Sequence, residues 1–189
     1  LGSAMAEGLA EAGTNTVVIG RRKEAGDVVV ASIRAKGHKA LFVQADVLDE
    51  KDLLNAKETI LKEFGSIDIL VNAAGGNLPG AVIMPEQNFF DLKMEEFQKV
   101  VDLNLKGTVL PTKVFCDVMA KRKKGVIINI ASMASFRPIT RVVGYSASKA
   151  AVDNFTQWLA VEMAKKFGEG IRVNAIAPGL VQTKFASAI

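Results

Sequence analysis

Residues 125–179 read GVIINIASMASFRPITRVVGYSASKAAVDNFTQWLAVEMAKKFGEGIRVNAIAPG, and this stretch decides the fold. An apolar, β-branched run at 126–130 has the length of a buried strand. A loop at 131–144 separates it from a long helix-period pattern at 145–167, and a second apolar run follows at 171–176. Strand, helix and strand at this spacing predict a βαβ unit whose two strands run parallel.

The same alternation continues from this unit toward the N-terminus. Further strands are predicted at 16–19, 40–44 and 67–71, and further helices at 2–12, 24–36, 49–64 and 94–119. Gly37 is expected to end one helix, Asp49 to cap the next, and Pro111 to kink the last. Right-handed crossovers place helices on both faces of such a sheet. The sequence therefore predicts a single Rossmann-type α/β domain over residues 1–189, with three layers and a doubly wound parallel sheet.

Length and composition suit one ordinary globular core. The chain has 189 residues, of which 49% are hydrophobic and 23% are charged. It starts with Leu1 inside what reads as a helix start, so a preceding strand is expected to be missing. No apolar run reaches the ~18 residues that a membrane span needs, and no signal peptide is visible. We expect a cytoplasmic protein with no membrane partner.

The charge and the rare residue types exclude several other classes of function. The net charge is +4, and four basic residues cluster at 121–124. No aromatic residues interleave this cluster, which favours a solvated helix end over a nucleic-acid site. With one cysteine, Cys116, and one histidine, His38, no internal disulfide can form, and a metal site of the zinc-dehydrogenase type is not expected. Cys116 lies in an apolar helical stretch and is predicted to be a core residue.

The strongest chemical signal is Tyr145-Ser-Ala-Ser-Lys149, in which a phenol and an amine are four residues apart. Residues at this spacing lie on one face of a helix. An ammonium close to a phenol favours the phenolate, so such a tyrosine can give a proton to a carbonyl or take one from an alcohol. The spacing alone is a weak signal, because an accidental surface pair would look the same.

Small and polar residues that follow the predicted strands supply the context. Ligands of parallel sheets bind beyond the carboxyl ends of the strands. Ser132 follows the strand at 126–130 and precedes Tyr145 in the loop. Asn104 lies among apolar neighbours in a helical run, where its amide needs a partner. Similar positions after other strands are Asn72-Ala73-Ala74-Gly75, Asp46-Val47 and Pro178-Gly179.

Taken together, these motifs resemble the short-chain dehydrogenase/reductase family over nearly the whole chain. The resemblance implies that Tyr145 is the general acid/base, that Lys149 holds the nicotinamide ribose, that Ser132 bonds the reacting oxygen, and that Asn104 positions a water linking Lys149 to solvent. The residues implied or argued to bind the cofactor are Gly2, Gly20, Arg21, Arg22, Asp46, Val47, Asn72, Ala73, Ala74, Gly75, Tyr145, Lys149, Pro178, Gly179, Val181 and Thr183.

The chain departs from the family pattern in three places. It stops near Ile189, where the family usually continues, so the resemblance implies that a C-terminal part is missing. Only Gly2 remains of the glycine-rich turn that binds the pyrophosphate, and Ala73 replaces the second asparagine of the usual Asn-Asn-Ala-Gly loop. The predicted strand at 16–19 is followed by Gly20-Arg21-Arg22, with no carboxylate to accept the adenosine 2′-hydroxyl. Two guanidiniums favour a 2′-phosphate, so NADP(H) is favoured and NAD(H) stays possible.

The substrate is expected to be a small molecule, and the loops look similar to the sugar-acid branch of the family. That branch includes D-mannonate oxidoreductases (fructuronate reductases) and gluconate 5-dehydrogenases. Asn77 could bind a substrate hydroxyl, Ser132 the reacting oxygen, and Arg137 or Arg141 a carboxylate; solvent-exposed loop residues are an equally good interpretation. The alternatives are a 3-oxoacyl-carrier-protein reductase and a catalytically silent dinucleotide-binding protein.

A homotetramer or homodimer is also expected. The helices predicted at 94–119 and 145–167 are apolar on more than one side, with Phe155, Trp158 and Val161 at different positions around the second. Such a helix is either deeply buried or paired with another subunit. The family resemblance implies the second arrangement, a two-fold interface of four helices.

Overall fold

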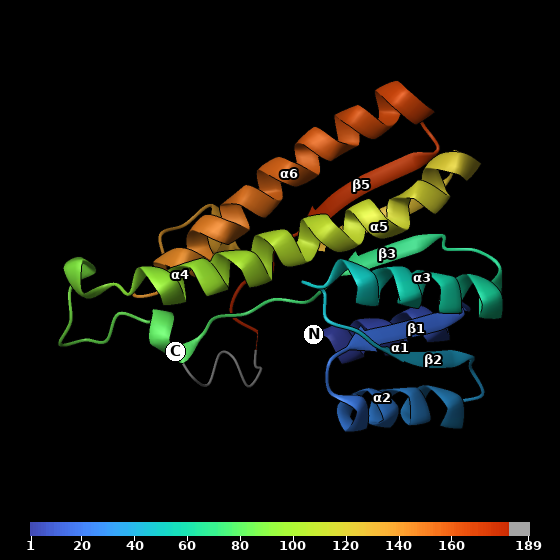
Figure 1. Cartoon of the computed structure of the whole chain (residues 1–189), viewed down its shortest axis with the longest axis horizontal. Helices are drawn as coiled ribbons and strands as arrows, with labels where there is room; N and C mark the ends of the chain where they lie inside the picture. The colour runs from blue at the N-terminus through green and yellow to red at the C-terminus, as the bar shows by residue number, and fades with distance from the viewer. Residues whose placement is uncertain (182–189) are drawn as a thin grey trace. The chain divides into compact units, whose positions relative to one another are not determined.

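A computed structural model describes residues 1–181, and these divide into two compact units that are described separately. Unit 1 spans Leu1–Ile67, and unit 2 begins at Asp68. Figure 1 colours unit 1 from blue to cyan and unit 2 from green to red. Each unit combines parallel strands with helices, which confirms the predicted α/β class of the Rossmann type.

Unit 1 contains two parallel strands and three helices. Strand β1 (Thr16–Gly20) pairs with β2 (Ala40–Gln44) in register, residue by residue from one end to the other. The helices are α1 (Gly2–Glu11), α2 (Lys23–Ala35) and α3 (Glu50–Phe64). Ala10, Val30, Ile33 and Ala40 form the core where α1 and α2 pack on the strands. The strand ends therefore carry Gly20 and Gln44 to the same edge.

Local signals set the helix ends of unit 1 as predicted. Asp49 precedes α3, and its side chain accepts hydrogen bonds from the backbone N–H groups of Lys51 and Asp52. Gly37 follows α2 with φ +84°, a left-handed conformation that glycine adopts without steric cost. Both predicted boundaries are confirmed.

Unit 2 contains three parallel strands in the order β3-β4-β5. These are β3 (Ile69–Asn72), β4 (Gly125–Ile130) and β5 (Ile171–Ile176), with helix α6 (Val143–Phe167) between the last two. Helix α6 packs on β5 and β4, and α5 (Gly107–Arg122) packs on β3 and β4. Figure 1 shows α5 and α6 running along the strands. The predicted βαβ unit is thus confirmed.

The long helix predicted at 94–119 is interrupted, and not where we expected. Helix α4 (Met94–Val101) leads into a π-helical turn, η3 (Asp102–Lys106), before α5 begins at Gly107. Pro111, the expected kink, lies inside α5. Single π turns are frequent at functional sites. Here the turn carries Asn104, whose side chain bonds a loop far away in the sequence.

Cys116 is buried on α5, which confirms its predicted place in the core. Burial raises the pKa of its thiol to about 12, with a smaller contribution from the nearby charge of Asp117. The basic residues at 121–124 lie at the end of α5, with Lys121 and Arg122 in its last turn. Arg122 pairs with Asp68 at 2.7 Å and Lys121 with Asp117 at 3.7 Å. Within residues 1–181, the helices are too short or too polar to cross a membrane.

Candidate active site

Tyr145 and Lys149 lie one turn apart at the start of α6, as their spacing predicts. The Nζ atom of Lys149 is 5.7 Å from the centroid of the Tyr145 ring. Lys149 is only 4% exposed, and its Nζ donates a 2.6 Å hydrogen bond to the carbonyl of Ile130, at the end of β4. A buried amine is thus held between the sheet edge and the phenol.

The environment of Lys149 weakens its ammonium form. Burial lowers its pKa from 10.5 to about 8, and the charge of Asp153, one turn further along α6, acts in the opposite direction. The amine is therefore still mostly protonated at neutral pH and loses its proton only slightly above it. Its three donors are not all used by the carbonyl of Ile130.

Ser132 lies in the loop directly after β4, two residues beyond the carbonyl that Lys149 binds. Its side chain is buried, and its Oγ accepts a 3.1 Å hydrogen bond from the backbone N–H of Ala134. The hydroxyl proton is still available to donate to a reacting oxygen. Ser132 and Lys149 are thus brought to the same end of β4.

Asn104 ties the π turn to the loop after β3. Its Oδ1 accepts from the N–H of Gly76 at 3.0 Å, and its Nδ2 donates to the carbonyls of Gly76 at 2.7 Å and Val100 at 2.8 Å. The expected partner of this fully buried amide is therefore found. A Cβ on Gly75 would stand 2.7 Å from Asn104 Oδ1 and 3.3 Å from Lys149 Nζ. Only glycine allows these three residues to come so close.

The side chain of Asn72, a residue predicted to line the cofactor, is directed into the core of unit 2. Its Nδ2 donates to Thr112 and to Asn129, both at 2.8 Å, and Asn129 donates to Thr156 on α6 at 2.9 Å. This buried polar chain joins α5, β3, β4 and α6. Asn129 was not predicted from the sequence, although a single amide in an apolar strand indicates a buried polar partner.

The residues predicted to bind adenosine lie at the strand ends of unit 1. Gly20 ends β1, Arg21 and Arg22 follow it, and Asp46 lies just beyond β2. Arg21 Nη1 is 3.7 Å from Asp46 Oδ2, and the Arg21 side chain is 71% exposed. Asp46 Oδ1 also accepts from the N–H of Leu48, so Val47 lies inside a tight turn. Gly2 begins α1.

The segment after β5 approaches the loop that carries Ser132. The carbonyl of Pro178 accepts from the N–H of Met133 at 3.0 Å, and a Cβ on Gly179 would meet the Met133 sulfur at 2.9 Å. Val181 is 39% exposed. Thr183, which was also predicted to flank the nicotinamide, lies outside the described residues.

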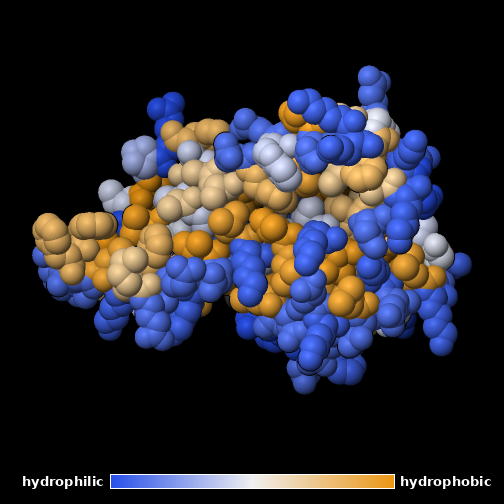
Figure 2. Space-filling model, turned by 45° about the horizontal axis from the view of Figure 1, so that its top comes forward, coloured by the Kyte–Doolittle hydropathy of each residue, from blue (hydrophilic) through white to orange (hydrophobic). Residues whose placement is uncertain are grey.

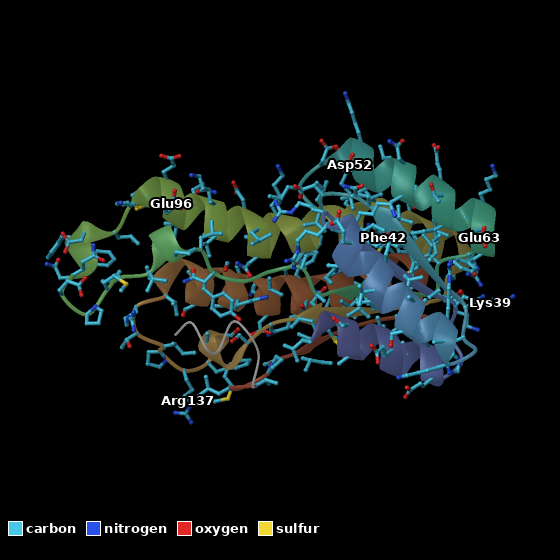
Figure 3. All side chains as sticks on the ribbon, turned by 90° about the horizontal axis from the view of Figure 1, so that it is seen from below. Lys39, Phe42, Asp52, Glu63, Glu96 and Arg137 are labelled. Carbon is cyan, nitrogen blue, oxygen red and sulfur yellow. The ribbon has the colours of Figure 1, made fainter. Side chains whose placement is uncertain are left out.

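The three remaining substrate candidates differ in their surroundings. Both polar atoms of the Asn77 amide are buried, and they have no hydrogen-bond partner among the described residues. Arg137 is exposed and points away from the ribbon in Figure 3. Arg141 is engaged within the protein, because its Nε donates to the carbonyl of Ile83 at 3.0 Å. Arg141 is therefore less suited to a substrate carboxylate than the sequence suggested.

These features define a class: an α/β protein with a tyrosine–lysine pair at the carboxyl ends of parallel strands and small residues beside it. The family model described as short chain dehydrogenase matches residues 1–189. The chain belongs to the short chain dehydrogenase family.

Individual relatives are similar in sequence and in structure. An uncharacterized oxidoreductase, UxuB, of Bacillus subtilis is 44% identical over 96% of this chain and 67% of its own length. A 3-oxoacyl-[acyl-carrier-protein] reductase of Synechocystis is 40% identical over 97% of this chain and 70% of its own. A Haemophilus structure assigned as a D-mannonate oxidoreductase, with bound NAD, matches with a TM-score of 0.89 and 39% identity, covering 96% of this chain and 68% of that one. The chain spans about two thirds of the length of the curated relatives it matches.

Proposed function

We propose that the protein is a nicotinamide-dependent oxidoreductase that interconverts a carbonyl and a secondary alcohol, with Tyr145 as its general acid/base. One observation carries the proposal: the buried amine of Lys149 is held beside the Tyr145 ring by the carbonyl of Ile130. A tyrosine hydroxyl in this position can give a proton to a carbonyl or take one from an alcohol. The nicotinamide, when bound, supplies or accepts the hydride.

The other side chains of the site orient the reactants. The Ser132 hydroxyl donates a hydrogen bond to the reacting oxygen while its own oxygen is held by the N–H of Ala134. Asn104 fixes the backbone of Gly76, and Gly75 leaves room beside Lys149 for a ligand group. Lys149 would hold the ribose hydroxyls with the donors that Ile130 does not use. The residues of unit 2 thus fit a dinucleotide.

The residues of unit 1 support NADP(H) as the preferred cofactor. Arg21 and Arg22 follow Gly20, and no carboxylate stands at these three positions. Arg21 is paired with Asp46 only at 3.7 Å and on the surface, where an ion pair contributes about 0–1 kcal/mol, so a 2′-phosphate can take its place. The similar Haemophilus structure contains NAD, which makes NAD(H) the alternative.

A sugar acid is the substrate class we favour. The similarity to the Haemophilus protein assigned as a D-mannonate oxidoreductase supports it. The desolvated amide of Asn77 also supports it, because an unpaired buried amide is costly unless a ligand hydroxyl bonds it. Among the two arginines considered, Arg137 is the better candidate for the carboxylate, since Arg141 already bonds Ile83.

A spectrophotometric scan of the full-length protein tests the function. D-Mannonate, D-gluconate, D-fructuronate and 5-keto-D-gluconate are each offered with NAD(H) and with NADP(H), and Tyr145→Phe serves as the control. We expect turnover of at least one acid that the control lacks. Turnover of acyl thioesters in place of all four acids would favour the second candidate, a 3-oxoacyl-carrier-protein reductase, which the Synechocystis relative supports.

The protein is also proposed to form a homodimer or homotetramer through α5 and α6. On α6, Trp158 is 59% and Val161 55% exposed, and Trp158 stacks on Phe155 with centroids 6.5 Å apart. Such apolar surface is stabilised by contact with a second copy of the helix. Light scattering of the full-length protein at micromolar concentration checks this, and a monomer mass with full activity would refute it.

A further inference from the structure

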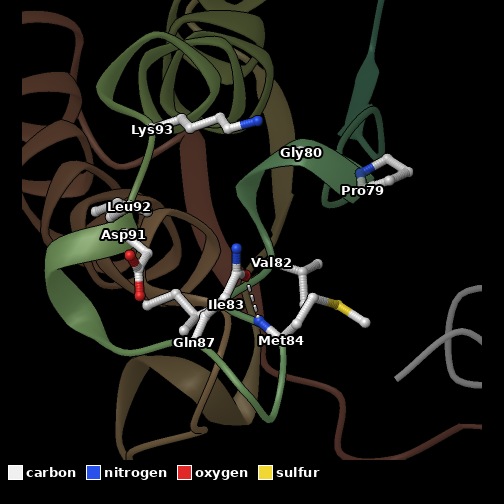
Figure 4. A pocket seen from close by; sticks show the side chains of 9 residues that line it. All are labelled: Pro79, Gly80, Val82, Ile83, Met84, Gln87, Asp91, Leu92 and Lys93. Carbon is white, nitrogen blue, oxygen red and sulfur yellow. Dashed lines mark hydrogen bonds between the residues drawn. The ribbon is translucent and has the colours of Figure 1, made fainter.

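Residues 79–92, here named the cap segment, form a loop with its own internal hydrogen bonds. Met84 and Gln87 bond each other twice, through Met84 N–H to Gln87 Oε1 and through Gln87 N–H to the Met84 carbonyl, both at 2.9 Å. Asn88 and Asp91 form a reciprocal capping box around η2 (Phe89–Asp91). Figure 4 shows the surface pocket of about 140 Å³ that Met84, Gln87 and Asp91 line together with other cap-segment residues and Lys93. The cap segment therefore holds its own shape.

Apolar burial holds only the start of the cap segment, where Ala81 is 1% exposed. Phe90 is 92% and Phe89 62% exposed, and Met94, just beyond the cap segment, is 64% exposed. Figure 2 shows this end of unit 2 as a cluster of apolar side chains at the surface. Beyond this buried start, residues 84–91 are exposed, and a stretch with so few buried apolar contacts opens easily. Its polar ties to the rest of unit 2 must therefore decide where it lies.

The middle of the cap segment is tied to one residue, Arg141, by both backbone and side chain. The N–H of Ile83 donates to the carbonyl of Arg141 at 2.9 Å, and Arg141 Nε donates to the carbonyl of Ile83 at 3.0 Å. The guanidinium also contacts the sulfur of Met84 at 3.7 Å. Ile83 and Arg141 are 58 residues apart, so this pair joins two otherwise separate parts of the chain.

Arg141 has an unusual backbone conformation, with φ +71°. A non-glycine residue in the left-handed region is uncommon and persists where its surroundings over-determine it. The next residue, Val142, is buried and precedes α6, and its carbonyl accepts from the N–H of Ser146. The bend at Arg141 therefore directs the chain into the helix turn that carries Tyr145.

The other end of the cap segment also adjoins the candidate active site. Three residues before it begins, Gly76 is held through both backbone groups by Asn104. Gly75 lies against Lys149. At the far end, Phe97 of α4 packs against Gly144, where an added Cβ would meet its ring at 3.1 Å. The cap segment thus starts close to Asn104. Its middle is bonded to Arg141, four residues before Tyr145.

We propose that Arg141 is a positioning residue, which latches the cap segment to the start of α6 and so holds it as one wall of the substrate site. The proposal rests on the proposed function, because the wall serves the substrate that reacts at Tyr145. Loss of the latch should weaken substrate binding and leave cofactor binding unchanged, since the cofactor residues assigned above lie outside the cap segment.

Hydrogen exchange of the full-length protein tests the latch without any substrate. Arg141→Ala removes the side chain and keeps the strained backbone, whereas Arg141→Gly removes both the side chain and the strain. We expect amides of residues 79–92 to exchange about tenfold faster in both variants, the effect of one charge-assisted hydrogen bond, with α5 and α6 unchanged. Unchanged exchange of the cap segment in Arg141→Gly would overturn the latch.

Lys123→Gly is the matched control. Lys123 is the second non-glycine residue with positive φ among those described, at 55°, and it ends α5 away from the cap segment. The substitution relaxes the backbone as Arg141→Gly does, but it removes no tie to Ile83. Cap-segment exchange is expected to stay at the wild-type rate. Faster exchange in this control would mean that glycine itself, rather than the lost guanidinium, releases the segment.

Steady-state kinetics test whether the cap segment lines the substrate site. They use the sugar acid that the wild type turns over. In Arg141→Ala and Arg141→Gly we expect KM to rise about tenfold, with kcat within about twofold and an unchanged Kd for the cofactor. Arg141→Lys, which can still donate one bond to Ile83, should have an intermediate KM. If the cap segment exchanged faster while KM stayed unchanged, the cap segment would not be a wall of the substrate site. If the wild type turns over none of the four acids, the sugar-acid proposal fails, while the exchange result still decides the latch.

Discussion

The two units place their functional residues in opposite kinds of environment. In unit 2, Asn104 is 0% and Lys149 4% exposed, and both are held by hydrogen bonds to backbone atoms. In unit 1, the side chain of Arg21 is 71% exposed and has only a long ion pair to Asp46. Buried groups held by hydrogen bonds are positioned in advance and are costly to change, whereas exposed charges are not. We therefore expect substitutions in unit 2 to abolish the reaction, and substitutions in unit 1 to change the preference between NADP(H) and NAD(H).

The largest expected effect comes from removing a single hydroxyl in unit 2. Tyr145→Phe should lower kcat by about 10²–10⁴ while cofactor binding stays nearly intact, because the ring keeps its packing and only the proton donor is lost. Steady-state kinetics and cofactor titration of the full-length protein measure both quantities. A variant that kept more than about a tenth of the wild-type kcat would show that Tyr145 is not the general acid/base.

The pH dependence of stability tests whether burial lowers the pKa of Lys149 in unit 2. The pKa of Lys149 is about 8 in the folded protein against an ordinary value of 10.5. Between these values the unfolded chain binds the extra proton, so the free energy of unfolding should rise with pH by about 1.4 kcal/mol per unit. Below about pH 8 both states are protonated, and the folded protein bears the cost of a buried cation.

Lys149→Met removes this titration. The unfolding free energy of the wild type relative to the variant should therefore increase from pH 8 to about 10, by at most about 3 kcal/mol. Denaturant titrations at several pH values in the absence of cofactor give the difference. Lys121→Met, at a side chain that is 79% exposed, is the control. If the curves of wild type and Lys149→Met ran parallel, burial would not control this amine.

Sequence reasoning predicted those elements whose signals are local. Asp49 and Gly37 stand next to the helix ends that they define, and the bounds of β2 and β5 follow from short apolar runs between turn residues. The π turn was missed because its reason is not local: Asn104 bonds Gly76, 28 residues earlier. Pro111 was the local signal used to predict a kink in that helix, and it indicated the wrong position.

The candidate site shows the same division between local and distant information. Tyr145 and Lys149 are recognisable because four residues make one helix turn. The carbonyl of Ile130, which holds Lys149, has no sequence signature, since every residue has one. Arg141 was one of two alternative candidates, with Arg137, for a substrate carboxylate, because a loop arginine is chemically suited to one. Its tie to Ile83 depends on a contact between distant parts of the chain that no spacing reveals.

The smallest expected effect concerns unit 1, where exposed residues should change cofactor choice with little loss of stability. Replacing Gly20 with Asp and both Arg21 and Arg22 with Ser should lower the NADP/NAD ratio of kcat/KM about tenfold or more, since a carboxylate repels the 2′-phosphate and two cations that attract it are lost.

Asp46→Asn should raise this ratio, because it frees Arg21 from its ion pair while the new amide oxygen can still accept from the N–H of Leu48. The free energy of unfolding should change by no more than about 1 kcal/mol for Arg21→Ser alone, as an exposed pair implies. Kinetics with both cofactors and denaturant titration provide the measurements. A wild type that already prefers NAD would show that the arginines do not bind a phosphate, and the contrast between a fixed unit 2 and an adjustable unit 1 would then rest on the exposure of these side chains alone.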